Sequence, residues 1–253
     1  GEPDTCNSVP AEGRGGGSGG SVWINFTNAG SFTSVANAVV ARGSQSYLSC
    51  LGSNGGGGSG GRVMVSGYTG TVAEDNVVAD SQGNYERLSG STGTVVLKPN
   101  GASLGGLFIH ATSAEQAGVP FKLFNTDPQF ASYTFKGTIA EIGNGGDFVL
   151  PSGRVINIDA TSRTATVGTT TYGVTIAAGS DLIIQTGAAL NLKGRVVSAP
   201  THEYGVLNIG NSSSLITQVG SFLNLETRGQ INNIGTGTVD TTALGSWFIN
   251  GIY

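Results

Sequence analysis

Two stretches in the C-terminal half of the chain, DLIIQTGAALNLK at Asp181–Lys193 and SLITQVGSFLNLE at Ser214–Glu226, are copies of one pattern set 33 residues apart. Both contain Gly-x-x-Leu-Asn-Leu, and in both the apolar residues fall at every second position. Alternation with a period of two is typical of a β-strand. Strands that recur at a fixed interval predict coils stacked on one another, with each apolar residue lying on its counterpart in the next coil.

A second repeat lies near the N-terminus. The segment Gly15–Ile24 reads GGGSGGSVWI and the segment Gly56–Val65 reads GGGSGGRVMV, 41 residues later. A flexible linker would be rich in Gly and Ser without an apolar, alternating continuation. Here each Gly block leads directly into a strand, which indicates a tight backbone turn or close packing of chains.

The composition supports stacked strands. Charged residues make up only 11% of the 253 residues, and Gly contributes 43. Stacked coils place equivalent side chains about 4.8 Å apart, so like charges would face each other. The sequence therefore predicts an all-β fold, a parallel β-helix (β-solenoid) with Gly-rich turns, and a β-sandwich is the alternative. Three parts are expected: a Gly-rich β-solenoid part at 1–107, an aromatic-rich irregular segment or insertion at 108–136, and C-terminal coils at 137–253.

Charge and hydropathy exclude two classes of function. The formal net charge is −4, and the 12 basic residues are scattered rather than gathered in a run. Nucleic-acid binding needs a basic footprint, so it is not predicted. No run of 18 or more apolar residues exists, so no membrane-spanning helix is predicted either.

The cysteines point to an oxidising compartment. A Cys6–Cys50 disulfide is predicted, with two buried free thiols as the alternative. The chain starts without Met and without a leader pattern, as expected of a mature form whose signal peptide has been removed. Asn25 and Asn211 each begin an Asn-x-Ser/Thr sequon and are candidate glycosylation sites.

The search for an active site gives only weak candidates. Glu141, Asp147 and Asp159 could supply paired carboxylates, and Asp159 lies about one expected coil before Asp181. The alternative is that these residues cap turns. His110 and His202 are the only histidines, and no nucleophile elbow accompanies them. No catalytic residue is predicted.

No metal site or cofactor is predicted either. The densest acidic group consists of Glu74, Asp75, Asn76 and Asp80. Oxygen ligands of this kind suit Ca²⁺, but the spacing matches no calcium loop, and a solvated loop is the better interpretation.

The C-terminal segment GSWFINGIY, Gly245–Tyr253, is uncharged and aromatic. It either pairs with its own last coil or adds as a strand to a neighbouring subunit. In the second case the subunit contact would consist of Trp247, Phe248, Ile249, Ile252 and Tyr253. Head-to-tail stacking of open coil ends would then build a filament.

The Gly-rich turns and the Gly-x-x-Leu-Asn-Leu coils resemble the repeats of secreted bacterial β-solenoid proteins, including autotransporter passengers and related surface adhesins. The resemblance implies a right-handed parallel β-helix, an extracellular or cell-surface location and a structural or adhesive role. We therefore expect a non-enzymatic protein that polymerises with itself and whose other partners are surface glycans. The alternative is a carbohydrate-binding or polysaccharide-degrading β-helix.

Overall fold

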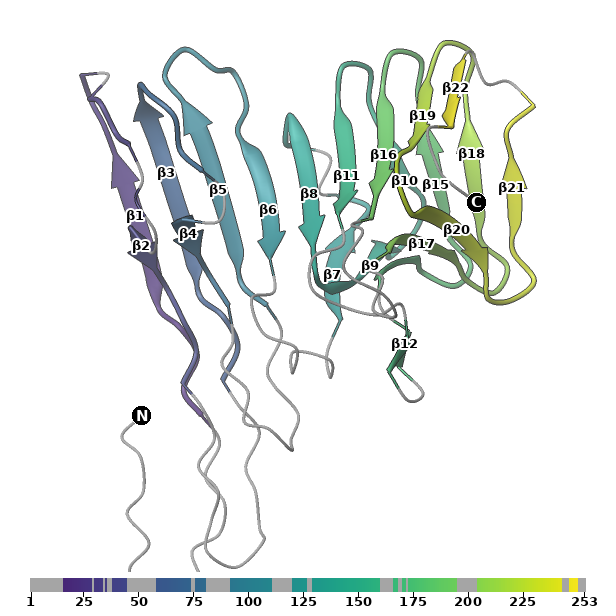
Figure 1. The fold of residues 1–253 in the computed structure, drawn as a ribbon, viewed down its shortest axis with the longest axis horizontal. Helices are drawn as coiled ribbons and strands as arrows, with labels where there is room; N and C mark the ends of the chain where they lie inside the picture. The colour runs from purple at the N-terminus through teal and green to yellow at the C-terminus, as the bar shows by residue number, and fades with distance from the viewer. Residues whose placement is uncertain are drawn as a thin grey trace, which may run out of the picture. The chain divides into compact units, whose positions relative to one another are not determined.

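The computed structural model describes fourteen stretches of the chain, separated by gaps. They are residues 16–28, 30–33, 35, 38–44, 58–73, 76–80, 92–110, 120–126, 129–159, 166–167, 170–171, 173–194, 204–242 and 246–249. Within these stretches the chain forms β-strands and no α-helix, and most strand pairs are parallel (Figure 1). The all-β prediction is confirmed, and a sandwich, which is built from antiparallel sheets, does not describe this pairing. None of the described segments forms a helix with the length and apolar character to cross a membrane. Cys6 and Cys50 lie outside the described residues.

The chain divides into two compact units, Gly1–Val119 and Pro120–Tyr253. The first unit contains a sheet of β1 (Ser21–Asn25), β3 (Arg62–Tyr68), β5 (Thr94–Pro99) and β6 (Gly106–His110). The first three strands are parallel, and β6 pairs antiparallel with β5. A second, parallel pair consists of β2 (Val39–Val40) and β4 (Val77–Val78). The two GGGSGG copies thus lead into neighbouring strands, in the register that their 41-residue offset predicts.

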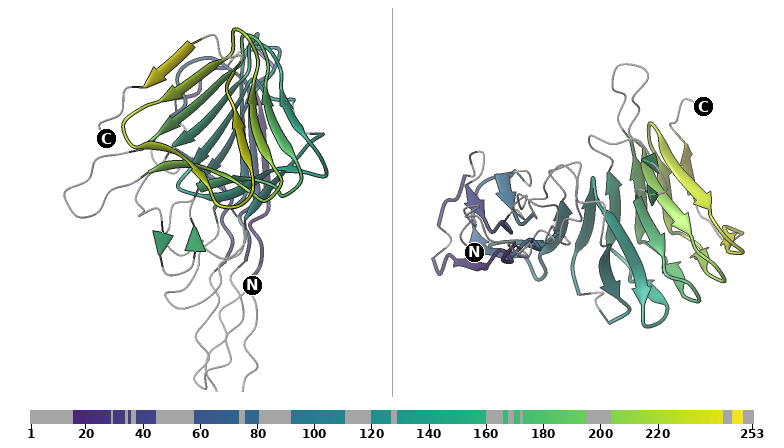
Figure 2. Two further views of the ribbon diagram at one scale, coloured as in Figure 1. Left: turned by 90° about the vertical axis from the view of Figure 1, so that its right-hand side faces the viewer. Right: turned by 90° about the horizontal axis from the view of Figure 1, so that it is seen from below.

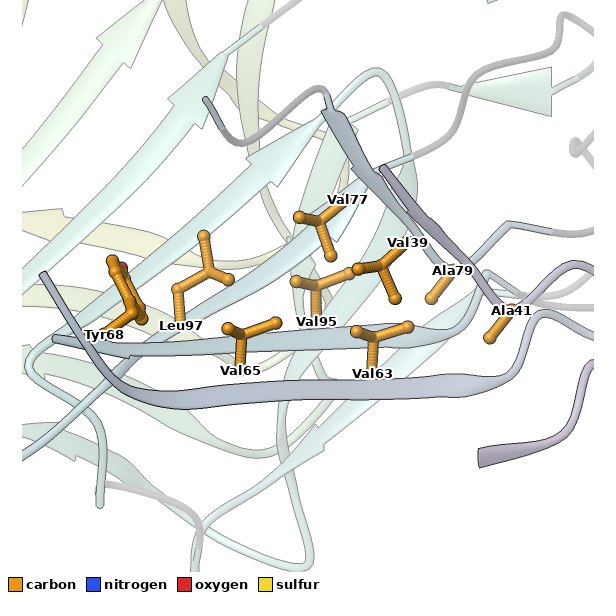
Figure 3. Close-up of a cluster of buried hydrophobic side chains, with 9 residues drawn as sticks. All are labelled: Val39, Ala41, Val63, Val65, Tyr68, Val77, Ala79, Val95 and Leu97. Atoms are coloured by element: carbon orange, nitrogen blue, oxygen red, sulfur yellow. The ribbon is translucent and has the colours of Figure 1, made fainter. Parts of the chain in front are cut away.

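The core of the first unit lies between these two layers. Figure 3 shows side chains of β3 and β5 facing those of the β2–β4 layer. The cluster consists of Val39, Ala41, Val63, Val65, Tyr68, Val77, Ala79, Val95 and Leu97. Burial raises the pKa of the Tyr68 phenol, because the phenolate would lose hydration there. Small β-branched residues predominate, which suits a thin core between short strands.

At the Gly-rich end the two layers come together without side chains between them. The Gly61 N–H donates to the Ala41 carbonyl at 2.8 Å, and the Gly93 N–H donates to the Ala79 carbonyl at 2.7 Å. Layers that interdigitate side chains lie about 10 Å apart, far beyond hydrogen-bond reach. A Cβ atom on Gly61 would overlap the Gly20 carbonyl oxygen. The predicted close packing of chains is therefore confirmed, and it closes this end of the core by backbone hydrogen bonds.

The second unit contains three parallel sheets, which we number by the order in which the chain visits them in each pass from residue 139 onward (Figure 2). The first sheet consists of β7 (Phe121–Phe124), β9 (Ile139–Asn144), β14 (Gly173–Ile176), β17 (Gly205–Ile209) and β20 (Gly229–Asn233). The second consists of β10 (Phe148–Leu150), β15 (Asp181–Ile184), β18 (Ser214–Thr217) and β21 (Thr238–Asp240). The third includes β8 (Ser132–Lys136), β11 (Val155–Asp159), β16 (Ala189–Lys193), β19 (Phe222–Leu225) and β22 (Ser246–Ile249). A short antiparallel hairpin, β12 (Thr166–Val167) and β13 (Thr170–Thr171), separates β11 from β14.

The chain passes through the three sheets in the same order several times. One such pass, for example β14, β15 and β16, is called a rung below. Leu182 pairs with Leu215 and Leu190 pairs with Leu223, as the 33-residue repeat predicts. These leucines are fully buried, so equivalent positions form apolar columns along the inside of the stack. Burial of each Leu side chain contributes roughly 1.5–3 kcal/mol before the entropy cost of ordering it.

Repeated turns join the second sheet to the third. Gly187 and Gly220 occupy equivalent turns with φ of 74° each. In each of these four-residue turns the N–H of the fourth residue donates to the carbonyl of the first. The glycine is the third residue, where a type II turn requires a positive φ. The Gly187 N–H also donates to the Gly220 carbonyl at 2.9 Å, which links one turn to the next. The single glycines between strands are therefore required by backbone conformation.

The turn from the first sheet to the second gives a first testable prediction. Ser212 has φ of 52°, where the equivalent residue of the preceding rung is Gly179 with φ of 75°. A left-handed conformation costs a non-Gly residue roughly 1–2 kcal/mol, so we expect Ser212→Gly to raise the free energy of unfolding by about 1 kcal/mol. The converse control is Gly179→Ala, because a Cβ there meets nothing within 4 Å and only the backbone term changes. Urea unfolding should move in opposite directions for the two variants, and a shift in the same direction would contradict this account.

Candidate functional site

Two polar columns run along the outer face of the third sheet. Asn224 Nδ2 donates to Asn191 Oδ1 at 2.6 Å, Asn191 Nδ2 donates to Asn157 Oδ1 at 2.8 Å, and Asn157 Nδ2 donates to Thr134 Oγ1 at 3.4 Å. The neighbouring column alternates in charge through Lys136, Asp159, Lys193 and Glu226. Lys193 Nζ lies 3.7 Å from Glu226 Oε2. The amide hydrogen bonds of the Asn column and the ion pair between Lys193 and Glu226 therefore tie neighbouring rungs together.

The candidate carboxylates are engaged within this stack. Glu141 lies 3.6 Å from Lys122 Nζ, and Asp147 Oδ1 accepts the Asp181 N–H at 2.9 Å. Asp159 lies in the third sheet, whereas Asp181 begins a strand of the second. The expectation that Asp159 and Asp181 are neighbours is therefore wrong, and the neighbour of Asp181 is Asp147. The Asp147 carboxylate therefore bonds to the backbone of the next rung, at the start of β15.

The predicted acidic group in the first unit is also divided. Glu74 and Asp75 lie outside the described residues, while the Asp80 side chain is almost fully buried and accepts from Arg42 Nε at 2.6 Å. Across the described stretches, no three His, Cys, Asp or Glu side chains gather as metal ligands would. Asp80 instead stabilises the Gly-rich end, where its backbone carbonyl also accepts the Gly43 N–H.

The remaining predicted residues lie on different elements. His110 ends β6 and is half-buried, and His202 lies outside the described residues. Asn25 is exposed in β1, with its Oδ1 accepting from Ser66 Oγ at 3.0 Å. Asn211 is exposed in a turn. Both sequon asparagines are thus exposed, whereas Ser213, the hydroxyl residue of the second sequon, is buried.

The C-terminal apolar segment supplies a strand to its own unit. β22 pairs parallel with β19, which puts Trp247 in register with Leu223 and Ile249 in register with Leu225. Phe248 is in register with Asn224, so it takes the next position after the Asn column. Ile252 and Tyr253 lie outside the described residues. Pairing with its own coil leaves the second edge of β22 without a partner strand among the residues described.

At the last rung, formed by β20, β21 and β22, the end of an apolar column is exposed to solvent. Phe148, Leu182 and Leu215 have no solvent exposure, but Val239, the next residue of this column, is 41% exposed. Four of the five exposed large apolar residues in the described part of the second unit lie on the last two rungs. They are Val219 at 69%, Phe222 at 45%, Ile234 at 54% and Val239; the fifth is Phe124. We call the edges of β20–β22 with Ile234 and Val239 the last-rung surface.

One charged group marks this surface. Asp240 ends β21, and its Oδ1 accepts from the Thr242 N–H at 3.1 Å and from Thr242 Oγ1 at 2.7 Å. These two hydrogen bonds lower the pKa of the Asp240 carboxyl. Because a lowered pKa favours the ionised form, the edge of β21 keeps its negative charge to a lower pH than it would without these two hydrogen bonds. A charge on an edge strand restricts which strands can pair with it.

Sequence reasoning missed the Asn column, although its signal was present. The Asn of Gly-x-x-Leu-Asn-Leu is identical in both copies, and a polar residue at a fixed outward position of stacked strands bonds to its own counterpart. The chain matches no protein-family model, and no curated protein or solved structure is detectably similar to it. Its function must be inferred from these surfaces.

Proposed function

We propose that the chain is an extracellular structural or adhesive protein, built as a right-handed parallel β-helix, that self-assembles head to tail through the last-rung surface. Three observations support the β-helix. The chain visits three sheets in a fixed order, the pairing within them is parallel, and the apolar columns run through successive rungs. Parallel strands joined by crossovers are almost always right-handed. The Gly-rich, charge-poor composition and the presence of two cysteines, Cys6 and Cys50, support the extracellular location.

The observation that carries the proposal is the exposed end of the apolar column at Val239. A column that is fully buried for three rungs and then 41% exposed needs a further rung to cover it. The adjoining strand edges carry backbone N–H and C=O groups that a further strand would satisfy. A second copy stacking here would supply both at once. Because such a contact joins different ends of two copies, it need not close and extends into a fibre.

Val239→Lys tests this proposal. We expect the lysine to raise the protein concentration needed for assembly at least about tenfold, because an ammonium would have to lose its hydration between two rungs. Val35→Lys is the matched control, since Val35 is 70% exposed in the first unit and outside any strand. Light scattering against concentration and negative-stain images give the readout. A wild-type chain that stays monomeric at every concentration, or a Val239→Lys variant that assembles normally, would overturn the proposal.

A further inference from the structure

The outer face of β1, β3 and β5 holds the most exposed large apolar side chain of the described residues. Trp23 lies in the middle of β1 and is 74% exposed. Its neighbours Val22 and Ile24 turn inward and pack against the core of the first unit. Alternation along the strand therefore directs the indole to solvent. An indole left in water costs hydrophobic free energy, which makes such a side chain a recurrent part of binding surfaces.

The residues in register with Trp23 extend this apolar strip. Trp23 pairs with Met64, and Met64 pairs with Val96, so the three side chains form one row across the sheet. Met64 and Val96 are half-buried. Neighbouring strands are about 4.8 Å apart, so the row is about 10 Å long. That length accommodates two sugar rings of a linear glycan.

Two cations flank the row. Arg62, in register with Ser21, lies on one side, and Lys98, in register with Ser66, lies on the other. The ion pairs of the described residues include neither Arg62 nor Lys98. No carboxylate of β1, β3 or β5 accompanies them, although the whole chain has a formal net charge of −4. This face is therefore locally cationic on an acidic protein.

We propose that this face, formed by Ser21, Trp23, Arg62, Met64, Val96 and Lys98, binds a carboxylated polysaccharide. A pyranose ring has an apolar C–H face that can lie on the indole and the Met64 thioether, as flat apolar groups do on aromatic rings. The carboxylates of an acidic sugar then reach Arg62 and Lys98, and Arg can hold a carboxylate with two parallel hydrogen bonds. A second copy of the same face is a poorer occupant, because it would bring the same two cations against these.

This inference goes beyond self-assembly and involves other residues. The last-rung surface belongs to the second unit, whereas the Trp23 face belongs to the first. The Val239→Lys variant therefore separates the two ideas, because glycan binding should persist in a chain that no longer assembles. A chain that fails to assemble should still bind the glycan. A chain that fails to bind the glycan should still assemble.

Calorimetric titration with tetragalacturonate tests the proposal, with its fully methyl-esterified form as the matched neutral ligand. We expect Trp23→Ala to weaken binding at least about tenfold, and Trp23→Phe to retain most of it because a flat ring remains. The pair Arg62→Gln and Lys98→Gln should remove the preference for the acid over the ester. Binding should also weaken as salt rises, since exposed charges are screened.

Three results would overturn the proposal. The first is that acid and ester bind equally to the wild-type chain. The second is that Trp23→Ala binds tetragalacturonate as the wild type does. The third is that octathymidylate binds to this face more tightly than the glycan, which would identify a single-stranded nucleic-acid surface instead.

Discussion

We expect Gly61→Ala to destabilise the first unit by about 3 kcal/mol, the cost of severe overpacking. Its new Cβ would overlap the Gly20 carbonyl oxygen and lie 2.7 Å from the Gly19 carbonyl carbon. Both are backbone atoms of the neighbouring segment of the same chain, so neither can move aside as the end of a side chain would. Relief requires the Gly61 segment to withdraw, which breaks its 2.8 Å hydrogen bond to the Ala41 carbonyl. Hydrogen exchange of the β3 amides during urea unfolding measures the loss in this unit.

Gly20→Ala is the matched control, because Gly20 holds the same place in the first GGGSGG copy as Gly61 does in the second. A Cβ on Gly20 meets nothing within 4 Å, and its φ is not positive. Replacing such a glycine reduces the entropy of the unfolded chain, so we expect a gain of roughly 0.4–1 kcal/mol. Equal losses for both variants would show that the backbone contacts at Gly61 do not close the core as described.

These two glycines also show what the sequence could predict. The copies have identical glycine blocks, and their 41-residue offset predicts that β1 and β3 pair, which they do. The sequence does not say that Gly20 lies at an edge while Gly61 is stacked on it. The second layer was also hidden, because residues 39–44 and 77–80 carry no repeat and only two-residue strands. Layer contacts arise from segments distant in sequence, whose pairing leaves no periodic signal.

The coil length explains the error at Asp159. A coil of roughly 20–25 residues, the value expected of a β-solenoid, puts Asp159 beside Asp181. In the structure Leu182 pairs with Leu215, 33 residues on, whereas Leu215 pairs with Val239, 24 residues on. The longer rungs carry excursions between the third sheet and the first, such as the β12–β13 hairpin. Because such excursions set the length of each coil, an average coil length does not predict which residues of neighbouring rungs pair. Only the repeated sequence pattern predicts that register.

The candidate surfaces were partly predictable. The apolar C-terminal strand was recognised from its composition, and it forms the edge of the third sheet. Trp23 lies in the N-terminal repeat, but alternation alone cannot tell which of the two apolar sets, Trp23 or Val22 and Ile24, faces the core. That choice depends on β2 and β4 covering one face and not the other.

The second large effect is expected at the ion pair between Arg42 and Asp80. We expect Arg42→Met to lower the free energy of unfolding of the first unit by about 3–5 kcal/mol. The Asp80 side chain is 2% exposed, and its Oδ1 lies 2.6 Å from Arg42 Nε. Without the guanidinium, a carboxylate stays in a site that water barely reaches, at the point where the two layers meet. Its desolvation is then no longer offset by the adjacent positive charge.

A double-mutant cycle separates the loss of the pair from the burial of a charge. Arg42→Met combined with Asp80→Leu removes both charges, and we expect it to recover most of the stability, since a buried pair is often no better than apolar residues of similar size. The surface pair of Lys193 and Glu226, with side chains 57% and 46% exposed, is the matched control. Lys193→Met should cost less than about 1 kcal/mol, because water and salt already screen that pair. If Arg42→Met cost no more than Lys193→Met, Asp80 would have to be hydrated, and the closed Gly-rich end of the core would be wrong.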